Sequence, residues 1–187
     1  MWNPWMEEGL EHLRLTQDGG GVVADSVIIG AENGVPFRIR YVIRCDVRWR
    51  VQNLRVSSLV GDDEEFEMFA DGKGCWIMAT GDIMPSLQGC SDVDISATPF
   101  TNTLPIRRLG LGAGKSADLE VVYLAVPEMR VEPARQRYTC LKRDARGGLY
   151  RFESLDGEFG GFTADLPIDA DGLVLDYPGL FRRARLG

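Results

Sequence analysis

Histidine and lysine are scarce in this sequence of 187 residues, and its cysteines have no recognisable spacing. His12 is the one histidine, so a Ser-His-Asp or Cys-His site would have to use it. The cysteines at positions 45, 75, 90 and 140 form neither a C-x-x-C pair nor a zinc-ribbon pattern. We therefore expect mostly buried free thiols, no catalytic residues of the triad type, no metal site and no cofactor.

Long apolar runs are also absent, and the longest fall far short of the roughly 20 residues that cross a membrane. The first eight residues lack the basic region and the apolar core of a signal peptide. With 28 acidic residues against 21 basic ones, the net charge of −7 argues against nucleic acid and anionic membranes as partners. We expect a cytoplasmic protein with no integral membrane segment.

Alternation of apolar and polar residues is the dominant pattern of the sequence. In the segment 37–51 one face carries Phe37, Tyr41 and Trp49 among other apolar residues, whereas most residues of the other face are arginine. At 3.3 Å per residue this segment would extend about 50 Å, but a chain of this size folds to about 40 Å across. We therefore expect a strand that curls or bends around Asp46, with a bulge near Gln52.

Turn signals divide the rest of the chain into roughly a dozen short strands at the spacing that is typical of all-β folds. One hairpin is expected from 66–69 and 76–78, which flank the turn Asp71-Gly72-Lys73-Gly74. The best helical candidate is the short segment 180–185. The sequence thus predicts one all-β domain over residues 1–187: a many-stranded antiparallel sheet, strongly curled or closed into a barrel, with little helix.

Five arginines share one face of the segment 37–51: Arg38, Arg40, Arg44, Arg48 and Arg50. Guanidinium groups bind carboxylates and phosphates, so this face could hold an anion or an acidic partner. Alternatively it is the outer face of a sheet, where the arginines pair with Glu65 and Glu67 of the next strand. The pattern alone leaves both interpretations open.

The segment 92–109 is the most distinctive. It places Thr101-Asn102-Thr103 between two prolines and ends on Arg107 and Arg108. Because proline fixes φ and disfavours helix, we expect a rigid extended crossing here. Its polar side chains could satisfy their own loop. Alternatively they form the polar rim of a cavity, where Arg107 or Arg108 meets an anionic or sugar head group.

Three blocks of the sequence resemble a known family, the putative glycolipid-binding proteins of bacteria. The blocks are residues 41–50, 92–109 and 171–183, and with the strand around Tyr138 they span nearly the whole chain. The resemblance implies a single barrel-like all-β domain, similar in fold to bacterial lipoprotein carriers that hold acyl chains in an apolar concavity. It implies no catalytic residues.

The leading hypothesis is therefore non-enzymatic binding of a lipid or glycolipid in an apolar concavity of a curled sheet. The candidate ligand-binding residues are Tyr41, Trp49, Trp76, Asn102, Arg107 and Arg108. Two alternatives remain. One is an interaction module that offers the arginine face to an acidic partner. The other is an enzyme that acts on a small anionic or sugar substrate with Asp92 and Asp94 as acid and base.

Overall fold

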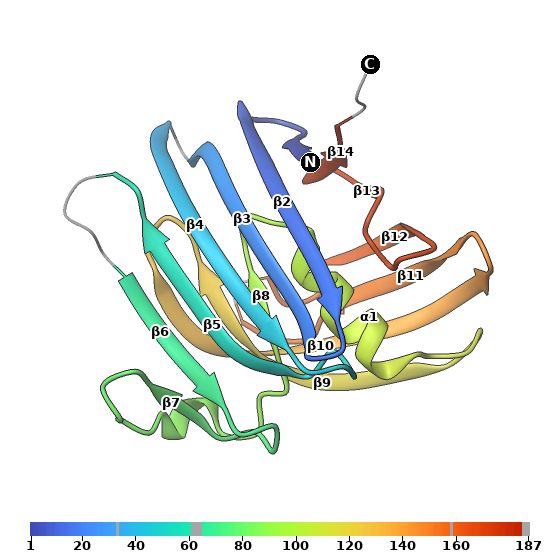
Figure 1. Ribbon diagram of the computed structural model, residues 1–187. Coiled ribbons are helices and arrows are strands. Elements are labelled where there is room, and N and C mark those ends of the chain that lie inside the picture. Colours follow the sequence, from blue (N-terminus) through green and yellow to red (C-terminus); the bar gives the residue numbers. More distant parts are fainter. Residues whose placement is uncertain (33, 61–64, 158, 185–187) are drawn as a thin grey trace.

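Two β-sheets make up most of the structure. The computed structural model describes residues 1–32, 34–60, 65–157 and 159–184, and Figure 1 shows the two sheets packed across each other with a short helix near the place where they meet. In strand order, the nine-stranded sheet A consists of β13 (Asp176–Tyr177), β14 (Phe181–Arg183), β1 (Trp2–Pro4), β2 (Gly9–Asp18), β3 (Gly21–Glu32), β4 (Val35–Cys45), β5 (Val51–Ser58), β6 (Glu65–Ala70) and β7 (Trp76–Met78). The five-stranded sheet B consists of β12 (Thr163–Asp169), β11 (Gly147–Ser154), β10 (Arg130–Asp144), β9 (Ser116–Ala125) and β8 (Asp92–Ile95).

The hydrophobic core lies between the two sheets. On β4, Ile39, Tyr41 and Ile43 are buried while the alternate Arg40 and Arg44 are exposed, as the period of two requires. From sheet B, side chains such as Val122 and Leu124 join the same apolar cluster. Each fully buried aliphatic side chain of this kind contributes about 1.5–3 kcal/mol, so the cluster is what holds the sheets together.

The all-β fold with little helix is confirmed, but the expected strongly curled sheet or barrel is not. Neither sheet closes on itself, because β13 and β7 stand at opposite ends of sheet A, as β12 and β8 do in sheet B. Pairing is antiparallel throughout both sheets except between β8 and β9. Alternation along a strand defines two faces but does not determine how far a sheet coils, so it could not separate two open sheets from a barrel.

The long strand expected over 37–51 is instead a hairpin. β4 ends at Cys45 and β5 begins at Val51, and the two strands pair side by side. Asp46 builds the turn, since its Oδ1 accepts the N–H groups of Arg48 at 2.8 Å and Arg50 at 2.9 Å. Trp49 adopts a left-handed φ of 65° there. The alternation continues through the turn, so the sequence pattern did not reveal the reversal. The pairing does skip Gln52, near which the sequence predicts a bulge.

The segment 92–109 is not the expected extended crossing, because only Asp92–Ile95 is a strand and residues 100–109 fold as helix. A 3-10 turn, Phe100–Asn102, leads directly into α1, Thr103–Leu109, and Gly110 ends that helix with a φ of 56°. Pro105 is the third residue of α1, within the first turn, where the backbone N–H has no partner inside the helix anyway. Proline is therefore compatible with this helix start. The helix expected within 180–185 is wrong as far as it is described, because Phe181–Arg183 forms β14.

All four cysteines are free thiols, as expected. Cys45, Cys90 and Cys140 are buried, and Cys75 is half-buried. Burial raises the pKa of the Cys45 thiol to about 12 and that of Cys90 to about 11, so both are protonated and unreactive near neutral pH. Across the residues that the structure describes, no helix is long and apolar enough to cross a membrane.

Candidate functional site

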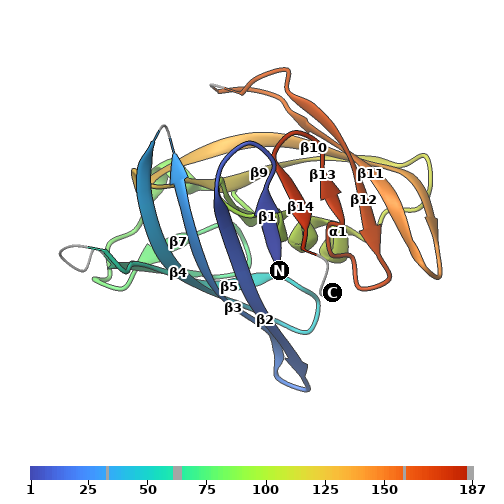
Figure 2. The ribbon, with the colours of Figure 1, turned by 90° about the horizontal axis from the view of Figure 1, so that it is seen from above.

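A cavity of about 1170 Å³ opens between the two sheets. Its walls come from β1 to β4 on one side and from β8 to β11 on the other. The segment Tyr177–Phe181 adds a third wall. In Figure 2, two strands of sheet A, β1 and β14, lie between β2 and the strands of sheet B. Ligand cavities in proteins usually measure about 300–1000 Å³, so this one is large enough for a sizeable small molecule.

Apolar side chains cover much of the cavity wall and continue onto the surface around it. Ile28, Phe37 and Phe152 belong to the wall. Six large hydrophobic side chains are both exposed and part of the cavity lining: Met6, Leu10, Ile29, Phe159, Phe162 and Leu180. Met6 leaves 87% of its surface in water. Exposed apolar residues gathered around a cavity, rather than scattered singly, are typical of a binding site for an apolar group.

A buried carboxylate, Glu11, lies in the wall contributed by β2. Glu11 is only 3% exposed. Its Oε1 accepts the hydroxyl groups of Ser26 at 2.8 Å and Tyr41 at 2.6 Å, and its Oε2 accepts that of Thr98 at 2.6 Å. Burial raises the pKa of Glu11 in spite of these three hydrogen bonds. No ion pair to Glu11 exists within the described part of the chain.

A second carboxylate, Asp94, lies in the opposite wall on β8. Its Oδ1 accepts the hydroxyl of Thr101 at 2.9 Å, and its Oδ2 accepts Nε2 of Gln136 at 2.6 Å. Burial raises the pKa of Asp94, and the two hydrogen bonds act in the opposite direction. Gln136 is 3% exposed, and its Oε1 has no hydrogen-bond partner among the described residues. A buried carbonyl oxygen without a donor is uncommon and costs about 1–3 kcal/mol.

One loop connects the two carboxylates. Thr98 donates its hydroxyl to Glu11 and Thr101 donates its hydroxyl to Asp94, while Thr101 Oγ1 lies 3.4 Å from the carbonyl oxygen of Thr98. Asn102, at the end of this loop, also lines the cavity, and its Oδ1 accepts the hydroxyl of Tyr138 at 2.9 Å. The segment interpreted as a polar rim therefore does place Asn102 in a cavity wall.

The three aromatic candidates lie in the core and are not part of the cavity lining. Tyr41 and Trp76 are completely buried and Trp49 nearly so. Trp76 donates its indole N–H to the carbonyl of Cys90 at 3.0 Å, and Tyr41 donates to Glu11. Alternation correctly placed Tyr41 and Trp76 on the inward side. It could not distinguish a side chain that fills the core from one that faces a cavity.

The two arginine candidates have partners inside the protein. Arg108 forms an ion pair with Asp92, which is fully buried. Its Nε lies 3.1 Å from both carboxylate oxygens, and its Nη2 lies 2.5 Å from Oδ2. Arg107 lies over the ring of Trp49, 5.0 Å from its centroid, and donates to the carbonyl of Asp171. Neither arginine lines the cavity, so the arginine contact with a head group has no support in this geometry. Asp92 is therefore held in its ion pair with Arg108, whereas Asp94 faces the cavity.

The arginine-rich face of β4 lies on the outside of sheet A. Arg40 forms a two-pronged ion pair with Asp25 of β3, at 2.9 and 2.8 Å, and both side chains are well exposed. Glu65 pairs with Arg55 instead, and Glu67 accepts from Asn53. Such exposed pairs contribute about 0–1 kcal/mol each. Binding of an acidic partner to this face stays a prediction.

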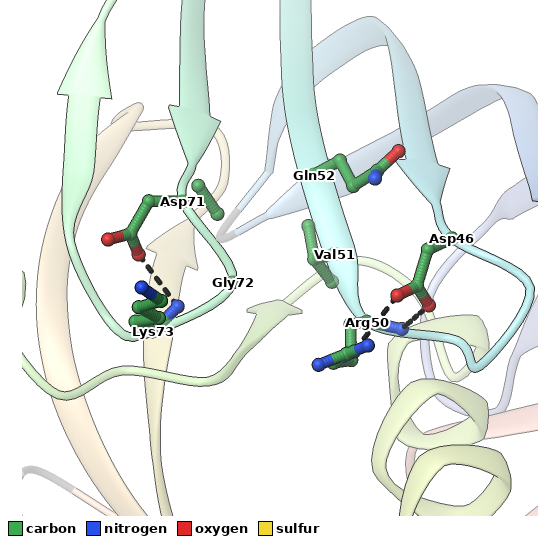
Figure 3. A pocket seen from close by; sticks show the side chains of 8 residues that line it. Asp46, Arg50, Val51, Gln52, Asp71, Gly72 and Lys73 are labelled. Carbon is green, nitrogen blue, oxygen red and sulfur yellow. Dashed lines mark hydrogen bonds and ion pairs between the residues drawn. The ribbon is translucent and has the colours of Figure 1, made fainter.

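A smaller cavity, of about 230 Å³, lies between the turn after β4 and the turn after β6 (Figure 3). Its two carboxylates, Asp46 and Asp71, accept hydrogen bonds from residues of their own turns. Asp46 accepts from Arg48 and Arg50, and Oδ1 of Asp71 accepts the N–H groups of Lys73 at 2.7 Å and Cys75 at 3.0 Å. These bonds lower the pKa of Asp71, and they show that its side chain stabilises the turn.

Glu11 and Gln136 were not recognised from the sequence. A signal did exist for Glu11, because it shares one strand face with Leu13 and Leu15 and is the only acid on that face near them. An acid on an inward face needs local partners or a functional reason. Gln136 has no comparable signal, because its partner Asp94 is 42 positions away in the sequence.

These features define an all-β protein with a large, partly apolar cavity between two open sheets. A family model described as "Putative glycolipid-binding" matches residues 1–183, and the chain belongs to this family. A protein of known crystal structure from Pseudomonas aeruginosa, described as a DUF1089 family protein, is 38% identical. The match covers 94% of this chain and 92% of the other, with a TM-score of 0.81. No curated protein matches the chain.

Proposed function

We propose that this protein binds a lipid or glycolipid in the cavity between its two sheets, without catalysing a reaction. The observation that carries the proposal is the number of apolar side chains that line this large cavity, among them exposed ones such as Met6 and Phe159. Water-exposed apolar area of this extent is unfavourable in a free protein and is relieved when an apolar chain covers it. The description of the family supports the same ligand class.

The cavity offers separate places for the two ends of such a ligand. An acyl chain would lie along the apolar side chains of Ile28, Phe37 and Phe152. The polar end would lie near Asp94 and Gln136, since the unpartnered Oε1 of Gln136 needs a hydrogen-bond donor. An amphiphile would therefore bind in one orientation.

Binding can be tested with N-phenyl-1-naphthylamine, an uncharged apolar dye that fluoresces when it leaves water. We expect the wild-type protein to enhance its fluorescence, and the variant Ala134→Trp to lose a large part of that signal because the indole would occupy cavity space beside β10. Ala117→Trp is the matched control. This alanine is also half-buried, on the neighbouring strand β9, but does not line the cavity.

Native mass spectrometry of the purified protein provides a second readout that needs no dye. We expect a copurified lipid mass in wild type and in Ala117→Trp but not in Ala134→Trp. If the wild-type protein shows neither a bound lipid nor dye fluorescence, the proposed function is wrong. Equal dye binding by both tryptophan variants would place the dye outside this cavity.

A further inference from the structure

The cavity is strongly acidic. Of the described residues in its lining, seven are carboxylates: Glu7, Glu11, Glu32, Asp94, Glu128, Glu132 and Asp156. Among the described residues, Arg130 is the single basic side chain in the lining, and it forms an ion pair with Glu132. A concave site lined by one sign of charge focuses its field into the cavity, attracts ligands of the opposite charge and repels those of its own.

Three of these acids lie near one another at the edge of the cavity. Burial and, after it, the charges of Glu7 and Glu128 raise the pKa of Glu32. All three side chains are exposed, and none of them has an ion-pair partner in the described structure. Like charges held together without a cation destabilise a fold. The stability of the fold therefore does not explain why these three acids lie together.

A second observation lies deeper in the same cavity. Gln136 is buried and donates from Nε2 to Asp94, which leaves its Oε1 as an acceptor with no donor. Asp94 has one hydrogen bond on each oxygen, whereas a carboxylate offers about four acceptor positions. These two side chains together therefore present acceptor capacity, and a cation beside Asp94 would favour its charged form. The group that fits them is a donor, and a positively charged donor fits best.

We propose, on the basis of the proposed lipid-binding function, that the polar end of the ligand carries a primary ammonium group. Its N–H groups would bond Oε1 of Gln136 and the carboxylate of Asp94, while Glu7, Glu32 and Glu128 attract its charge at the edge of the cavity. Two kinds of lipid offer this chemistry, a long-chain amine and a lipid with an amino-sugar head group. The same field disfavours lipids with phosphate, sulfate or carboxylate ends.

A panel of ligands with one decyl chain and different head groups tests the proposal. Each would displace N-phenyl-1-naphthylamine from the protein, below its own critical micelle concentration. We expect decylamine to bind roughly tenfold or more tightly than decyl sulfate, with decyl glucoside between them. Decyltrimethylammonium, which has the charge but no N–H, should bind less tightly than decylamine. The difference in affinity between decylamine and decyl sulfate should decrease as the NaCl concentration rises from about 0.02 M to about 0.5 M.

The same panel distinguishes the two sources of the ammonium group. A decyl glycoside of glucosamine that binds more tightly than decylamine would indicate an amino-sugar lipid, and the reverse order would indicate a long-chain amine. Decyl sulfate or decyl glucoside binding as tightly as decylamine would overturn the inference but leave lipid binding intact. Displacement of the dye by no member of the panel would instead contradict the proposed function.

Two variants connect the preference to the named residues. Asp94→Asn and the double variant Glu32→Gln/Glu128→Gln should each weaken decylamine binding by roughly three- to tenfold and leave decyl glucoside nearly unchanged. Asp171→Asn, an exposed acid that does not line the cavity, is the control for Asp94→Asn, since each removes one charge. If Asp171→Asn weakens decylamine binding as much as the other two, the effect belongs to the net charge of the protein and the inference is wrong.

Discussion

Replacing Arg108 with alanine is expected to lower the free energy of unfolding by about 3–5 kcal/mol, because the change leaves the carboxylate of Asp92 charged and without its partner. Asp92 has no exposure to solvent, and the guanidinium of Arg108 supplies three of its hydrogen bonds. Ser91 supplies one more, at 2.9 Å. The measurement is equilibrium unfolding in urea.

A matched pair of variants separates this ion pair from other effects of the substitution. Asp92→Leu/Arg108→Met removes both charges and should recover much of the loss, since a buried pair is often replaceable by apolar residues of similar size. Arg40→Ala is the control for an exposed pair, and we expect it to cost at most about 1 kcal/mol. An Arg108→Ala loss no greater than that of Arg40→Ala would show that the buried pair is not a major support of the fold.

Replacing Glu11 with alanine is expected to cost about 2–4 kcal/mol, because three hydroxyl groups lose their acceptor at a buried site. They belong to Ser26, Tyr41 and Thr98, so the loss affects β3, β4 and the loop after β8 together. Glu11→Gln should cost much less, since the amide oxygen still accepts and the Thr98 hydroxyl can turn to accept from the amide nitrogen. Thermal unfolding at fixed pH compares the two.

The pH dependence of Glu11→Gln is a separate test. Burial raises the pKa of Glu11 above its ordinary value of 4.5, so the folded protein holds this proton more tightly than the unfolded chain does. The stability that protonated Glu11 contributes is therefore fully present below about pH 4.5. It is lost as the pH rises through the raised pKa of Glu11. Wild type should lose stability relative to Glu11→Gln as the pH rises from 4.5 toward 8. A constant difference between them over this range would show that the pKa of Glu11 is not raised.

The segment 98–109 shows how local rules can mislead. Its two prolines predicted extended backbone, and the structure instead has helix there. Pro99 precedes the 3-10 turn and Pro105 lies in the first turn of α1, two places where no hydrogen bond is lost. Leu104 and Ile106 are buried, so tertiary packing stabilises a helix that is too short to persist in isolation.

The hairpin at 46–50 shows a different limit. The alternation was interpreted correctly for each strand, and the burial of Ile39, Tyr41 and Ile43 follows it. The reversal depends on one side chain, Asp46, whose oxygens accept three hydrogen bonds within the turn. A polar residue between two apolar ones looks the same in a turn as in a strand, so the pattern could not show where the strand ended.

The amino-acid sequence was enough to establish an all-β chain of short strands, free thiols and, through three blocks of residues, the family. These properties depend on local alternation, on turns and on composition, all of which can be recognised within a few neighbouring residues. The cavity and its acidic character were decided only by the tertiary structure. Glu11 lies 87 positions from Thr98, and Asp94 lies 42 from Gln136. Which inward side chains fill the core and which face a ligand depends on how far apart two sheets pack, and no single strand contains that information.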